Sequence, residues 1–135
     1  MNFEPKSRNL DTFVPDNLLA GDFPIVTTEI TIEQGQNLKR GSLLGKKIEG
    51  GKWVLSATVT DDEAQTPIED GSQFPRVILS TDIDASAADR VAVAYKTGQF
   101  NRHAVTLGAG HSIESTEDFL DQRGLYLVDA VRGDI

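Results

Sequence analysis

Short apolar runs separated by glycines are the feature that most constrains the fold of this chain. They are clearest in residues 35–46 (GQNLKRGSLLGK) and 77–101 (VILSTDIDASAADRVAVAYKTGQFN). Such runs are too short for most helices and are typical of buried β-strands joined by turns. The pattern predicts a mainly β protein, a small barrel-like or sandwich-like domain. The glycines expected to shape its turns are Gly35, Gly41, Gly45 and Gly98.

The surrounding residues extend the strand pattern. In residues 25–33 apolar and polar side chains alternate, which predicts a strand with one buried face. Gly50-Gly51 is a strong turn signal before a further strand at residues 53–59, so a hairpin is expected there. Other short strands are expected at residues 42–44, 76–80, 91–96, 100–107 and 125–128.

One short helix is expected near the C-terminus, at residues 115–123 (STEDFLDQR). Ser115 can accept hydrogen bonds from the first backbone amides, and Glu117 and Asp118 suit the positive end of the helix dipole. Gly124 can end the helix in a left-handed conformation.

Residues 1–24 differ from the rest of the chain, which suggests a division into an N-terminal arm (1–24) and a β-rich domain (25–135). Phenylalanine and proline recur together in the arm, and proline favours extended backbone. Its aromatic rings either cover an edge of the domain's own core or dock on a neighbouring subunit. The residues expected to anchor such docking are Phe3, Phe13, Pro15 and Phe23.

Composition excludes several classes of protein. A chain of 135 residues is expected to form one domain, and without cysteine it has no disulfide and no cysteine-ligated zinc. The net charge of −8 and the scattered lysines and arginines argue against nucleic acid as a partner. No apolar run approaches the roughly 18 residues of a membrane span, and the N-terminus lacks the apolar region of a secretory signal.

The motifs that suggest chemistry are incomplete. Gly41-x-x-x-Gly45-Lys46 is one residue short of a phosphate-binding loop. Asp82 and Asp84 fit a capped turn better than a cation site, and the two histidines have no third ligand in their pattern. We therefore expect no catalytic residue, no metal and no cofactor.

The order of these segments resembles that of lambda-type bacteriophage head decoration proteins, over residues 25–128. Residues 26–46 match a strand followed by a G-x-x-L-x-R-G-x-x-L-G-like run. Residues 78–101 match an apolar strand, an Asp-x-Asp-Ala-Ser-like turn, a second strand and Gly-x-Phe-Asn. The tail at residues 120–127 (LDQRGLYL) also fits. The matching positions are Gly35, Leu38, Arg40, Gly41, Leu44, Gly45, Ile78, Leu79, Asp82, Asp84, Ala85, Gly98, Phe100 and Asn101.

The resemblance implies a virion protein that binds the major capsid protein. Such proteins assemble as homotrimers on the outer surface of the capsid, stabilise the head against internal DNA pressure, and use an N-terminal segment that orders on the capsid. Nucleic acid, membrane and enzymatic activity are not expected. Two alternatives stay open, namely another phage structural subunit of the tail or head-completion type and a small ligand-binding β-barrel.

Overall fold

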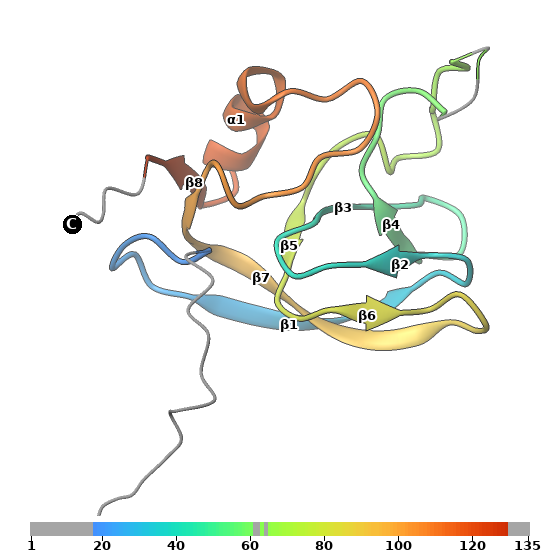
Figure 1. The fold of residues 1–135 in the computed structure, drawn as a ribbon, viewed down its shortest axis with the longest axis horizontal. Coiled ribbons are helices and arrows are strands. Elements are labelled where there is room, and N and C mark those ends of the chain that lie inside the picture. Colours follow the sequence, from blue (N-terminus) through green and yellow to red (C-terminus); the bar gives the residue numbers. More distant parts are fainter. Residues whose placement is uncertain (1–17, 61–62, 64, 130–135) are drawn as a thin grey trace, which may run out of the picture.

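The computed structural model describes residues 18–60, 63 and 65–129, and within them the protein is mainly β, as predicted (Figure 1). The single helix of this part is α1 (Ile113–Asp121). The strands are β1 (Val26–Ile32), β2 (Asn37–Leu38), β3 (Leu43–Lys46), β4 (Trp53–Leu55), β5 (Val77–Leu79), β6 (Ile83–Asp84), β7 (Arg90–Asn101) and β8 (Leu125–Val128).

Five of the strands close into a barrel in the order β1-β4-β3-β5-β7, with β7 pairing back to β1. The antiparallel β1–β7 ladder is long, from Val26 opposite Thr97 to Ile32 opposite Arg90. The parallel β1–β4 contact is short and has one pair, Ile32 with Trp53. β8 lies outside the barrel, parallel to the last residues of β7, and β2 pairs with β6 as a separate ribbon.

The barrel interior is filled by alternate residues of the strands. On β7 the inward positions are the small Ala92 and Ala94, and Ile30 of β1 lies directly opposite Ala92. A large residue thus lies beside a small one on the neighbouring strand, which keeps the narrow interior filled without overlap. Val91 and Val93 point outward and are exposed. The interior residues are Ile30, Ile32, Leu38, Leu44, Val77, Leu79, Ala85, Ala92 and Ala94.

A second apolar cluster lies on the outside of the barrel wall, and we call it the outer cluster. It is covered by α1, by β8 and by the segment before β1. Phe100 lies at its centre with no exposed surface and contacts the ring of Tyr95 at 5.3 Å between centroids. The members of the outer cluster are Leu18, Leu43, Ile78, Tyr95, Phe100, Leu120, Leu125 and Leu127.

Two of the predicted turn glycines lie inside strands instead, so the turn prediction is wrong for Gly45 and Gly98. A Cβ on Gly45 would lie 2.1 Å from the carbonyl oxygen of Ser72, so glycine is needed there for close packing of backbone. Gly98 has φ +149°, a conformation open to glycine, at the point where β7 stops pairing with β1 and begins pairing with β8.

The extents of four predicted elements also change. Residues 91–96 and 100–107 were expected as two strands, but Gly98 keeps the chain extended and β7 runs unbroken from Arg90 to Asn101. The predicted strand at 53–59 ends at Leu55. The helix begins earlier than predicted, because Ser112 is the capping residue: its hydroxyl accepts from the Ser115 amide at 3.1 Å, and the Ser115 hydroxyl accepts from the Ser112 amide at 2.9 Å.

Candidate interaction surface

Residues 18–24, which the sequence assigns to the arm, pack against the body of the protein. Leu18 is fully buried in the outer cluster, and its carbonyl accepts from the Asn101 amide at 2.7 Å. The Ala20 amide donates to the Gln99 carbonyl at 3.0 Å, and the Phe23 amide donates to the Gln99 side chain at 2.9 Å. This N-terminal segment is therefore held along the last part of β7 (Figure 1).

The segment keeps its polar backbone inward and leaves apolar side chains exposed. Thr97 joins it to β7, because its hydroxyl accepts from the Val26 amide at 3.0 Å and donates to the Pro24 carbonyl at 2.8 Å. The Phe23 ring lies edge-on against Tyr126 of β8, with centroids 4.9 Å apart. Several apolar residues close together in the chain and exposed at the surface are typical of an interaction site. We call this set the apolar strip: Leu19, Phe23, Ile25 and Val26.

The predicted site residues are only partly brought together. Phe23 belongs to the apolar strip, whereas Phe3, Phe13 and Pro15 lie outside the described residues. Gly35 and Gly41 lie in turns at positive φ, and a Cβ on Gly41 would approach the Ala104 carbonyl to 2.6 Å. These glycines shape the fold and do not contribute side chains to a surface.

Among the described residues, Ser56 and His111 come closest to a catalytic pair. Their hydrogen bonds make them unsuitable as a nucleophile and its base. His111 Nε2 lies 2.9 Å from the Gln73 carbonyl, which accepts only if that nitrogen carries the proton. Nε2 therefore has no lone pair for the Ser56 hydroxyl 3.1 Å away, which donates to the Ser72 carbonyl at 2.8 Å. Burial lowers the pKa of His111. These contacts indicate that His111 has a structural role in the fold.

The acidic and lysine-bearing motifs also have structural explanations. Asp82 Oδ1 accepts from the Arg40 amide at 2.8 Å, and Asp84 Oδ1 accepts from the Ser86 amide at 3.0 Å, so both cap turns. Within the described ranges, no group of three or more potential metal ligands occurs. Lys46 ends a strand and does not follow a phosphate-binding loop. No helix in this part of the chain is long and apolar enough to cross a membrane.

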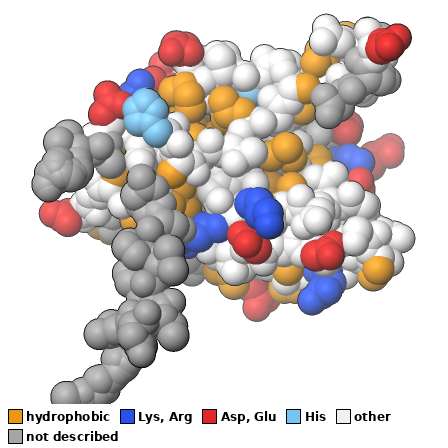
Figure 2. Space-filling model, viewed as in Figure 1, with side chains coloured by type: hydrophobic (Ala, Val, Ile, Leu, Met, Phe, Trp, Pro, Cys, Tyr) orange, Lys and Arg blue, Asp and Glu red, His pale blue; other side chains and the backbone are white. Residues whose placement is uncertain are grey.

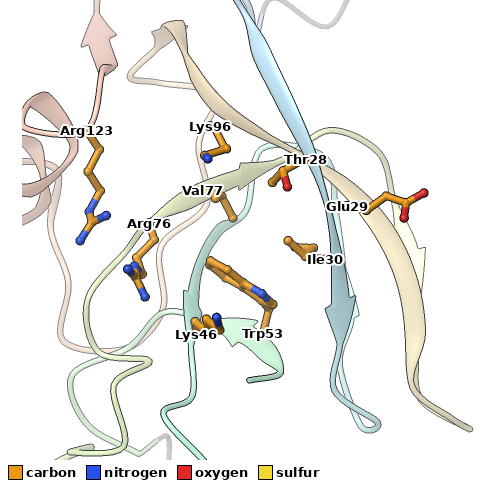
Figure 3. Close-up of a pocket in the computed structure, with 9 residues that line it drawn as sticks. All are labelled: Thr28, Glu29, Ile30, Lys46, Trp53, Arg76, Val77, Lys96 and Arg123. Carbon is orange, nitrogen blue, oxygen red and sulfur yellow. The ribbon is translucent and has the colours of Figure 1, made fainter. Parts of the chain in front are cut away.

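A basic groove is the surface feature that sequence reasoning missed. On the face drawn in Figure 2, lysines and arginines lie singly among other side chains. Figure 3 shows another place, where four cations surround a hollow of about 370 Å³ beside Trp53. They come from β3, from the residue before β5, from β7 and from the turn after α1, so only the folded chain brings them together. The four are Lys46, Arg76, Lys96 and Arg123.

Comparison with known protein families assigns this chain to a family. The model of the family described as bacteriophage lambda head decoration protein D matches residues 11–124. The chain belongs to this family. The match takes in the barrel, α1 and the segment that carries the apolar strip, and it ends just before β8. No curated protein matches the chain. Membership indicates a non-enzymatic structural role in decorating the phage capsid, as part of the virion.

Proposed function

We propose that the protein binds the outer surface of the capsid as a homotrimer, contacts the major capsid protein, and stabilises the head against internal DNA pressure. The observation that carries the proposal is the family match over residues 11–124. The fold is consistent with a mechanical role, because a closed barrel has few free strand edges and resists deformation as a unit.

The N-terminal segment supplies a route for attachment. Its backbone is fixed to Gln99 and Thr97, so Leu18, the residue that follows the arm at 1–17, is held beside the apolar strip. An extended segment can add a strand to an exposed sheet edge on a partner. In a trimer, three such segments act together, and multivalent attachment is much tighter than any single contact. Phe3, Phe13 and Pro15 are the proposed anchors within residues 1–17.

The apolar strip is proposed to contribute by burial against the capsid subunit. Phe23 and Ile25 are 37% and 44% exposed, so part of each side chain is free to be covered. Covering the exposed half of a large apolar side chain stabilises a complex by about 1 kcal/mol. The apolar strip alone would give weak binding. The N-terminal arms and the three copies in a trimer would raise the overall affinity.

Mixing the purified protein with expanded, undecorated heads tests the proposal. We expect saturable binding, density with three-fold symmetry on the outer surface, and decorated heads that retain their DNA at temperatures where bare heads release it. Absence of binding would overturn the proposal. A ring of five- or six-fold symmetry would instead favour a tail or head-completion subunit.

Single substitutions then test the anchors. Phe13→Ala is expected to weaken binding to heads more than Lys6→Ala, because an aromatic anchor buries a large apolar area on a partner, whereas lysine is depleted in the cores of interfaces. Phe74→Ala is a matched control on the body, since its ring is exposed and lies beside Phe119, outside the apolar strip. Equal effects of all three would contradict aromatic anchoring.

A further inference from the structure

The four cations of the basic groove have no carboxylate partner within the described residues. Elsewhere in the same part of the chain, lysine and arginine form close ion pairs, as Lys47 does with Glu33 at 2.8 Å and Lys52 with Asp89 at 2.7 Å. The one carboxylate that lines the groove belongs to Glu29, and Figure 3 shows its side chain pointing away from the cations. Like charges held close together repel, so an anionic partner would be bound favourably here.

The groove is also longer than a single small anion requires. A second hollow of about 310 Å³ continues it along β1, past Lys46 and Trp53 to Thr31 and Val91. Val91 gives this end an apolar character, since its side chain is 62% exposed. The shape therefore suits a chain that lies along β1, with acidic side chains at one end and an apolar one at the other.

The edge of β1 beside the groove is available for backbone pairing. β1 pairs with β7 along its whole length on one side, but on the other side only Ile32 pairs with β4. From Val26 to Thr31, that other edge has no strand partner in the described part of the chain. A strand edge without a partner is a site where an extended segment can add to a sheet.

We propose that the basic groove binds an extended acidic segment of the capsid subunit. Its backbone pairs with the free edge of β1, and its carboxylates lie among Arg76, Arg123 and the two lysines. Arginine binds carboxylates through two parallel hydrogen bonds, which suits this role. A second copy of the chain is a poorer occupant, because it would bring its own net charge of −8 to the contact. The identity of the partner rests on the proposed function.

Trp53 makes the groove directly observable, because it is the sole tryptophan of the protein and lines both hollows. Titration with a tetraglutamate peptide is expected to change its fluorescence saturably, with weaker binding at higher salt. The double variant Lys46→Gln/Lys96→Gln, at two exposed positions of the groove, should weaken this binding about tenfold. The control Lys39→Gln/Arg90→Gln makes the same change of charge outside the groove and should leave the binding unchanged.

Three results of this titration would overturn the proposal. One is the absence of any saturable response to tetraglutamate. Another is binding of a thymidine tetranucleotide at least as tight as that of tetraglutamate, which would show that the groove selects phosphates. A saturable response that both double variants weaken equally would also contradict it, because the binding would then depend on net charge and not on the groove.

Binding of the same variants to undecorated heads separates this inference from the proposed function. If the native chain fails to bind, the proposed function is wrong, and the tetraglutamate titration still decides whether the groove prefers acidic segments. If the native chain binds and Lys46→Gln/Lys96→Gln binds equally well, the inference is wrong. If that variant loses its oligomeric state by sedimentation, the groove joins copies of the chain and its assignment to the capsid is overturned.

Discussion

The two apolar clusters of the protein are built in different ways. The barrel interior takes its residues from strands between β1 and β7 and from Ala85, just after β6, and the inward positions follow the alternation along the strands. The outer cluster joins Leu18, at the start of the described chain, to Leu120, Leu125 and Leu127 near its end. One cluster forms the barrel, and the other attaches both ends of the described chain to its wall.

Because of this difference, the outer cluster, and not the barrel interior, holds the apolar strip in position. Leu18 lies next to Leu19 of the apolar strip, and Leu125 and Leu127 flank Tyr126, which contacts Phe23. The outer cluster therefore positions the proposed attachment site, while the barrel interior supplies the rigid body. An outer cluster that had little effect on stability would be only a loosely attached cover and could not hold the attachment site in place.

Phe100→Ala is the most severe test of this comparison. Phe100 is fully buried and contacts Tyr95, so its truncation is expected to lower the free energy of unfolding by about 4 kcal/mol. Ile32→Ala in the barrel interior is the matched control and should cost about 3 kcal/mol. Urea denaturation measures both. A loss below about 1 kcal/mol for Phe100→Ala would show that the outer cluster is not part of the stable core.

Truncation of the N-terminus separates the arm from the segment that is packed on the body. Removal of residues 1–17 should leave the free energy of unfolding nearly unchanged and reduce binding to heads. Removal of residues 1–24 also deletes Leu18 and its hydrogen bond to Asn101, and should cost about 3 kcal/mol, similar to Leu18→Ala. Equal stability of the two truncated chains, measured by thermal unfolding, would place Leu18 outside the core.

Much of the barrel could be predicted from the sequence, because strand alternation and glycine turns are local signals. The hairpin at Gly50-Gly51 and the strand at residues 125–128 are confirmed. The boundary of the arm was harder to predict, because residues 18–24 carry no periodic pattern. Their position depends on hydrogen bonds to Gln99 and Thr97, which lie more than 70 residues away in the chain.

The roles of the glycines and the existence of the basic groove could not be predicted from the sequence either. The sequence reveals that a glycine is present but not whether it permits a turn, as at Gly35, or a close approach of backbone, as at Gly45. The four cations of the groove are spread from Lys46 to Arg123, and no spacing rule links them. The register of β3, β5 and β7 brings the first three cations together, and the packing of α1 on the barrel wall adds Arg123. Both depend on tertiary contacts.

Gly45→Ala and Gly35→Ala test the distinction between these two roles. The added methyl group at position 45 would overlap the Ser72 backbone, and we expect a loss of about 2 kcal/mol. At position 35 nothing lies within 4 Å, so the cost is only that of φ +103°, about 1 kcal/mol. Urea denaturation of both variants measures the difference, and a larger loss for Gly35→Ala would contradict the role assigned to Gly45.

The smallest effect expected is a pH dependence from His111, which lies where the loop at residues 72–73 meets the barrel. Its Nδ1 is buried and has no hydrogen-bond partner in the structure, so the added proton of the charged form would have no acceptor. Burial holds its pKa below the ordinary value of about 6.5, while the unfolded chain keeps that value. Between these two pKa values the unfolded state binds more protons, so stability falls as the pH drops below about 6.5.

His111→Gln should therefore reduce the loss of stability between pH 7 and pH 5. Two carboxylates do not interfere in this window, because hydrogen bonds from Ser86 and Lys52 lower the pKa values of Asp84 and Asp89 further below it. Chemical denaturation at several pH values gives the slope for the native chain and the variant. An unchanged slope in the variant would mean that burial does not lower the pKa of His111 in the folded protein, and the packing around Ser56 and Gln73 would then need another explanation.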